Sequence, residues 1–102
     1  GKIPGVTVPV ERPDCEHVYH LYVIQHEQRD ALKAHLQKLG IGTVLNYPKA
    51  LPFYGAYAYL GHASEDFPTA YHHQSRILSL PIFPFMRDEE LAYVVESIRS
   101  FA

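Results

Sequence analysis

Seven histidines and a single cysteine are the residues of this chain that could hold a metal or act as nucleophiles. His17 and His20 are three residues apart in a predicted strand, which places them on opposite faces. His72 and His73 are adjacent in a predicted helix, about 100° apart around its axis. Cys15 has no second cysteine to join it, and no H-E-x-x-H pattern occurs. We therefore expect no metal site, and a cysteine without a catalytic role.

The serines and carboxylates also lack the spacing that catalysis requires. No G-x-S-x-G motif and no glycine-rich phosphate loop is present. The acidic residues gather at 65–66 and 88–90, each at the start of a predicted helix, where the helix dipole favours negative charge. The residues alone therefore predict no catalytic group in this chain.

The stretch LNYPKALPFYGAY, residues 45–57, is the best candidate for a binding site. Asn46 and Tyr47 end a predicted strand, and Pro48 stops it. The strand ends of layered α/β folds often face ligands, and an amide beside a phenol can hydrogen-bond and stack on a sugar or base. The alternative is that the aromatics of this segment only fill or fasten to the core. These aromatics are Phe53, Tyr54, Tyr57 and Tyr59.

Hydrophobic periodicity predicts the elements that position this stretch. In a strand over residues 17–25, successive side chains would point to opposite faces, and both sets are largely apolar. This predicts a central strand that is covered on both faces. Residues 29–39 then follow a helical period, and Gly40 is placed for a left-handed cap. Residues 41–46 read as a second strand. The apolar stripe of the helix is Leu32, Leu36 and Leu39.

The second half of the chain alternates in the same way. A short helix is predicted over 53–60, followed by a helix that Ser64 caps and that runs to residue 77 or 78. Residues 78–85 read as a short apolar strand leading into a turn with two prolines, and a final amphipathic helix is predicted over 88–101. Strands alternating with helices indicate an α/β or α+β fold, a small few-stranded sheet with helices packed on it.

Composition narrows the possible classes of protein. A length of 102 residues predicts one domain. The net charge is −2 and the nine Lys and Arg are scattered, which argues against a nucleic-acid partner. No apolar run reaches the roughly 20 residues that cross a membrane. One cysteine suits a reducing cytoplasm.

The first 16 residues differ from the rest of the chain. Prolines at positions 4, 9 and 13 predict an extended arm or linker over 1–16, with an edge strand near Val6–Val10. The compact domain is expected over 17–102. Because the chain begins with Gly1 rather than methionine, we expect it to be a piece of a longer protein.

The ordered segments HVYHLYVI, GIGTVLNYP, ALPFYGAYAYLGH and DFPTAYHHQSRILSLPIFP resemble a known family. They are similar to the C-terminal part of the DegT/DnrJ/StrS aminotransferases, which use pyridoxal phosphate and act on nucleotide-linked keto-sugars. The resemblance covers residues 17–101. It implies the small C-terminal domain of a fold-type I aminotransferase, with a large cofactor domain elsewhere and a homodimeric parent enzyme.

The resemblance also implies what this chain lacks. The Schiff-base lysine of the family belongs to the large domain, and none of Lys2, Lys33, Lys38 and Lys49 lies in a matching motif. We therefore expect pyridoxal phosphate in the parent enzyme and no catalytic or cofactor-binding residue in this chain. The amino donor implied by the family is glutamate.

Two positions depart from the family pattern. The family commonly carries His-Tyr-Pro at the end of this strand, near the sugar nucleotide, where this chain has Asn46, Tyr47 and Pro48. Many members have a histidine where this chain has Pro52. The resemblance implies that Asn46 and Tyr47 contact the substrate. Asn46 would do so as an amide, which both donates and accepts hydrogen bonds.

Two other classes of function remain open at this point. One is a stand-alone α/β module that binds a small molecule or regulates, without catalysis. The other is a pure interaction domain, because aromatic stretches also mark partner surfaces.

Overall fold

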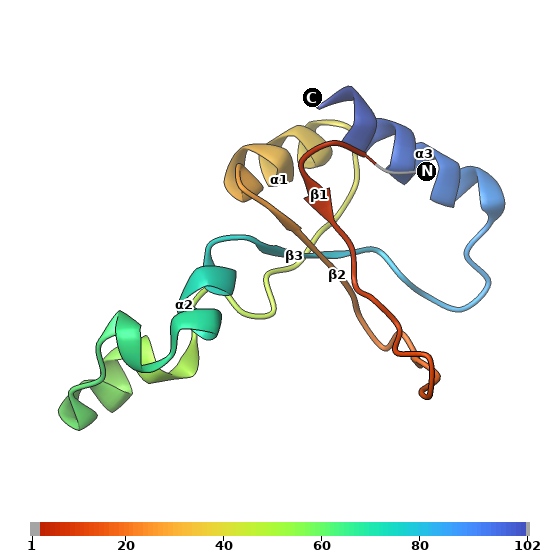
Figure 1. The fold of residues 1–102 in the computed structure, drawn as a ribbon. Coiled ribbons are helices and arrows are strands. Elements are labelled where there is room, and N and C mark those ends of the chain that lie inside the picture. The colour runs from red at the N-terminus through yellow and green to blue at the C-terminus, as the bar shows by residue number, and fades with distance from the viewer. Residues whose placement is uncertain (1–2, 102) are drawn as a thin grey trace.

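The fold is a three-stranded antiparallel sheet with two long helices on one face (Figure 1). The computed structural model describes residues 3–101; Lys2 lies outside this range. The strands are β1 (Val6–Thr7), β2 (Tyr22–His26) and β3 (Ile77–Leu80), in the order β1-β2-β3. The two helices are α1 (Arg29–Lys38) and α3 (Asp88–Ser100). The predicted fold class, with β2 as the central strand, is confirmed.

A single small core joins the sheet to the two helices. Ile24 of β2 and Leu78 of β3 are paired in the register and are both fully buried. Leu32 and Leu36 of α1 pack against them and are fully buried as well. The remaining buried apolar residues are Ile41, Val94 and Ile98. The core therefore draws on the predicted helical stripes and central strand, but Leu39 of the predicted α1 stripe follows the end of that helix and is 37% exposed.

The ends of the two long helices follow their predicted chemistry. Gly40 follows α1 with φ +78°, the left-handed conformation expected of it. At the start of α3, the backbone N–H of Arg87 donates to Glu90 Oε2 at 3.1 Å. That bond lowers the pKa of the Glu90 carboxyl, because it stabilises the charged form. Local sequence thus fixes both helix boundaries.

The strands are shorter than predicted. Residues 17–21 are not part of β2, because β3 pairs with it only from Tyr22 onward, and Val18 is 87% exposed. His17 and His20 therefore do not face opposite sides of a strand. The prediction that this strand is covered on both faces is also wrong, since only Ile24 of β2 is buried. A strand extends only as far as a neighbour supplies its hydrogen bonds.

The segment 41–46 forms no strand and makes only one bridge, from Val44 to Ser79. The strand β3 stops at Leu80, just before the two prolines of the predicted turn, because Pro81 has no N–H to donate to a ladder. The edge strand predicted in the arm is present as the two residues of β1.

The middle of the chain forms short helices rather than longer ones. The predicted helix over 53–60 consists of the 3₁₀ turns η1 (Leu51–Phe53) and η2 (Gly55–Leu60). The helix predicted from Ser64 is divided into η3 (Ser64–Asp66) and α2 (Pro68–Gln74). Pro68 restarts the helix because it fits the first turn, where no N–H is needed.

Two details of that predicted helix are corrected by the structure. Ser64 is not its cap: the backbone N–H of Ala63 donates to Asp66 Oδ2 at 2.8 Å, and the Ser64 hydroxyl instead donates to Glu65. The helix ends at Gln74, because Ile77 already pairs in β3.

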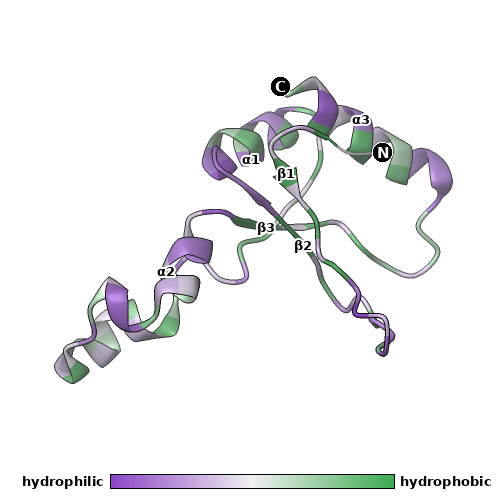
Figure 2. Ribbon diagram, in the orientation of Figure 1, coloured by the Kyte–Doolittle hydropathy of each residue, from purple (hydrophilic) through white to green (hydrophobic). Residues whose placement is uncertain are grey.

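Two segments project away from the packed sheet. One runs from the end of the 41–46 segment through α2, and the other is the loop before β2 (Figure 1). The radius of gyration is 15.5 Å, above the ~13 Å typical of a compact chain of this length. Apolar residues occur along both segments (Figure 2), and many are exposed. Those with at least half of their surface exposed include Val10, Val18, Leu51, Tyr59 and Leu60.

The left-handed cap at Gly40 leads to a matched test. An added Cβ would meet no atom within 4 Å at Gly40 or at Gly42, but only Gly40 has a positive φ. Gly40→Ala should therefore lower the free energy of unfolding by about 1 kcal/mol through backbone strain alone. Gly42→Ala should be neutral or stabilising by up to about 1 kcal/mol. Urea unfolding followed by circular dichroism measures both, and equal effects would contradict the assigned cap.

Candidate functional site

An open hollow of about 480 Å³ lies between the segment after residue 46, the 3₁₀ turns and α2. We call it the aromatic hollow. Three tyrosines line it, Tyr47, Tyr54 and Tyr57, together with His73 and Gln74 from α2. The other lining residues are Lys49, Ala50, Leu51, Ala56, Ala70 and Ile77. Its walls are mostly apolar with a few polar groups, which is the usual make-up of a small-molecule site.

The structure places the two predicted site residues differently. Tyr47 is 69% exposed and lines the aromatic hollow. Asn46 is half-buried beside the hollow and does not line it. The side chain of Asn46 is fixed by β3, because the hydroxyl of Ser79 donates to Asn46 Oδ1 at 2.8 Å. The pair therefore presents one free aromatic ring and one fixed amide at neighbouring positions.

The aromatics of residues 53–59 do not fill the core. No member of the core cluster comes from them, and Tyr59 is 80% exposed. The ring of Phe53 instead packs edge-on against Tyr71, with centroids 5.5 Å apart. The idea that these rings fasten the segment to the core is therefore wrong. Phe53 instead packs the 3₁₀ turns against α2, and Tyr54 and Tyr57 line the hollow.

Side chains from α2 form one wall of the hollow. No pattern in the sequence had linked them to this site. Gln74 Oε1 accepts the backbone N–H of Ala50 at 2.9 Å, which fixes the loop after Tyr47 to the helix. His73 lies next to Gln74 and lines the same hollow. His73 and Gln74 lie three and four residues after Ala70, so the helical period places all three on one face of α2. That spacing was the signal by which they could have been found.

A buried arginine fixes the end of α2 to the sheet. The guanidinium of Arg29 is only 7% exposed, and its Nη1 donates to the carbonyls of Gln74 and Ile77 at 3.2 and 2.9 Å. Its Nε lies 2.6 Å from Asp30, whose carboxylate is 85% exposed, so that ion pair contributes little. Arg29 thus joins α1, α2 and β3 at one point. No local pattern indicates this role, since an arginine at a helix start is usually solvated.

Both the sequence and the fold are similar to those of known proteins. The sequence profile of the DegT/DnrJ/EryC1/StrS aminotransferase family matches residues 1–99. The chain belongs to this family. The crystal structure of Streptomyces venezuelae DesV in complex with a ketimine intermediate has a TM-score of 0.92 at 33% identity. That match covers 97% of this chain and 27% of DesV.

Two curated relatives are similar over almost the whole chain. A dTDP-3-amino-3,4,6-trideoxy-alpha-D-glucose transaminase from Streptomyces venezuelae is 35% identical over 102 residues, covering 98% of this chain and 26% of that protein. The erythromycin biosynthesis sensory transduction protein EryC1 from Saccharopolyspora erythraea is 35% identical over 100 residues, covering 98% and 27%. The chain spans about a quarter of the length of these relatives.

The family is dependent on pyridoxal phosphate, but the residues around the hollow do not fit that cofactor. A bound pyridoxal ring needs a lysine for the Schiff base and an acidic partner for its nitrogen. Lys49 is exposed, and the described lining includes no aspartate or glutamate.

Within residues 3–101 no three of His, Cys, Asp and Glu gather as metal ligands, and every helix is too short or too polar to cross a bilayer.

The position of Arg29 leads to a test of how the hollow is built. Arg29→Lys replaces a planar group that serves two carbonyls with a single ammonium, so the free energy of unfolding should fall by about 1–3 kcal/mol. Arg76→Lys is the matched control, because its Nη1 is 3.5 Å from Glu27 and its ion pair is partly solvated. Urea unfolding of both variants provides the measurement. A loss at Arg76 as large as that at Arg29 would refute this role.

Proposed function

We propose that this chain is the C-terminal small domain of a pyridoxal-phosphate-dependent aminotransferase that moves an amino group to a nucleotide-linked keto-sugar. Glutamate is the proposed amino donor. The observation that carries the proposal is the similarity, over 98% of the chain, to a transaminase of a dTDP-linked sugar. The family profile and the DesV fold support it independently. In this proposal residues 1–16 form the arm and 17–102 the domain.

The proposed task of the domain is to form one wall of the substrate pocket. The exposed ring of Tyr47 can stack on a sugar or base while its hydroxyl hydrogen-bonds. Asn46, fixed through its oxygen, has two N–H donors left for a substrate oxygen. The aromatic hollow beside them excludes water from that side of the substrate. These groups bind and orient, and they perform no proton transfer.

The cofactor and its lysine would come from a large domain elsewhere in the parent enzyme, and this chain alone is proposed to hold none. The exposed apolar residues of the projecting segments support this arrangement, because apolar surface of this extent usually marks an interface. Contacts with the large domain, within a homodimeric parent, would cover it. An exposed, free Cys15 suits a reducing compartment, so we place the enzyme in the cytoplasm.

The regulatory alternative also has one observation in its favour, the name of EryC1 as a sensory transduction protein. The two functions differ in an absorbance experiment on the full-length protein. An aminotransferase loaded with pyridoxal phosphate changes its visible spectrum on addition of glutamate, and again on addition of a dTDP- or UDP-linked keto-sugar. A regulator without catalysis gives neither spectral change, and that result would reject the proposed function.

The substrate contact of Tyr47 can be tested by removing its hydroxyl. Tyr47→Phe in the full-length enzyme should raise the KM for the nucleotide sugar roughly 3- to 10-fold, because one hydrogen bond is lost. The KM for glutamate should be unchanged. Tyr59→Phe is the matched control, since Tyr59 is 80% exposed and does not line the hollow. Unchanged sugar kinetics in a folded Tyr47→Phe enzyme would remove Tyr47 from the site.

A further inference from the structure

The hydroxyl of Ser79 is a buried group that the proposed function has not yet used. Ser79 is 4% exposed in the middle of β3, and its Oγ donates to Asn46 Oδ1 at 2.8 Å. Two backbone hydrogen bonds also join Ser79 to Val44, in the segment that carries Asn46. The Ser79 N–H donates to the Val44 carbonyl at 2.8 Å, and the Val44 N–H donates to the Ser79 carbonyl at 3.1 Å.

This arrangement decides which end of the Asn46 amide is available. An unrestrained asparagine can turn either its oxygen or its nitrogen toward a ligand, because the two ends differ little in shape. In this structure the Ser79 hydroxyl donates to the oxygen, so the nitrogen is the end left for another partner. Among residues 3–101 no atom accepts a bond from Asn46 Nδ2, and no buried side-chain nitrogen or oxygen lacks a partner. The Nδ2 group is therefore open to solvent.

We propose that Ser79 is a positioning residue that fixes Asn46 as a hydrogen-bond donor toward an oxygen of the nucleotide-sugar substrate. The inference rests on the proposed function and adds a partner to it. Fixing the amide in advance removes the cost of choosing between two orientations on binding. In this orientation the amide nitrogen suits an acceptor, such as a sugar oxygen or a phosphate oxygen.

The pair Asn46 and Ser79 also explains how this chain uses its departure from the family pattern. The hydroxyl that fixes the amide comes from the strand next to residue 46, across the only bridge that this segment makes among the described residues. Loss of the hydroxyl would leave the backbone bridge intact, because that bridge uses main-chain atoms. The positioning effect can thus be separated from the folding of β3.

The test is a double-mutant cycle in the full-length enzyme, with dTDP- and UDP-linked keto-sugars as probes. Asn46→Ala and Ser79→Ala should each raise the KM for the sugar, roughly 3- to 10-fold. In the Asn46→Ala background, Ser79→Ala should have no further effect. The KM for glutamate should stay constant. Ser97→Ala is the matched control, since Ser97 is also buried, at 5%, and donates to Tyr93 O within α3.

The outcomes separate this inference from the proposed function. If Asn46→Ala leaves the sugar kinetics unchanged, the proposed site is wrong. If Asn46→Ala raises the KM and Ser79→Ala does not, or if the two effects simply add, only the role of Ser79 is overturned.

A second measurement covers the case in which Ser79→Ala does not fold. In unaltered protein, the Ser79 hydroxyl proton should exchange slowly and give a nuclear Overhauser effect to the Asn46 side-chain amide. A rapidly exchanging hydroxyl would refute the positioning role.

Discussion

The four residues of β3 hold the structure together, because alternating side chains give the strand two different tasks. Successive residues of a strand point to opposite faces. Leu78 therefore enters the core under α1 and α3, while Ser79 faces the segment that carries Asn46. The carbonyl of Ile77 accepts from buried Arg29, which fixes the preceding helix α2. The core, the candidate site and the projecting segment thus all contact β3. A substitution in this strand would therefore affect all three.

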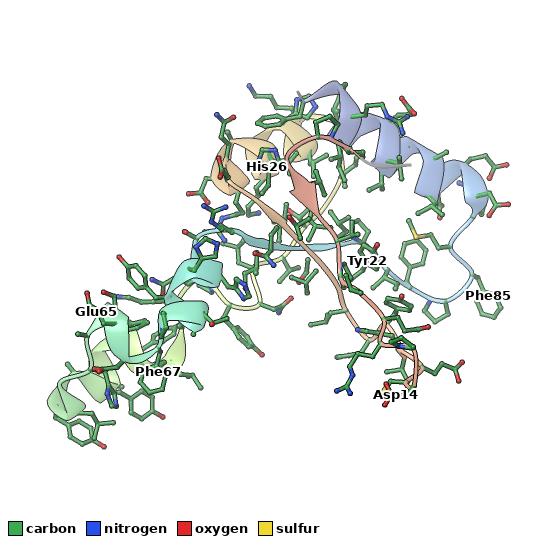
Figure 3. All side chains as sticks on the ribbon, viewed as in Figure 1. Asp14, Tyr22, His26, Glu65, Phe67 and Phe85 are labelled. Carbon is green, nitrogen blue, oxygen red and sulfur yellow. The ribbon has the colours of Figure 1, made fainter. Side chains whose placement is uncertain are left out.

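The small size of the core explains why so much apolar surface remains exposed. Seven apolar residues are buried in a chain of 102, and helices cover one face of the sheet only. A compact domain of this size would bury a little over ~60% of its unfolded surface. The segment through α2 instead extends outward, and Phe85 projects into solvent on the loop before α3, 98% exposed (Figure 3). This exposed apolar surface is what the proposed contacts with a large domain would cover.

The sequence predicted the elements that depend on local signals and missed those that depend on distant partners. The periods of α1 and α3 and the cap at Gly40 are properties of a few neighbouring residues, so they could be predicted. The length of β2 depends on where β1 and β3 end, which no local pattern records. Asn46 was selected as the end of a predicted strand over 41–46, although that segment forms an isolated bridge rather than a strand. Ser79, 33 residues away, looked like an ordinary strand residue.

The amide at position 46 also changes how the proposed contact responds to pH. A histidine at this position would alter its charge near pH ~6.5 and could then accept or donate according to pH. An amide has no such transition, and Ser79 further holds it in one orientation. The hydrogen bond that Asn46 offers is therefore the same at pH 5 and pH 8. Any pH dependence of the proposed sugar contact must then arise from the substrate or from groups other than Asn46 and Ser79.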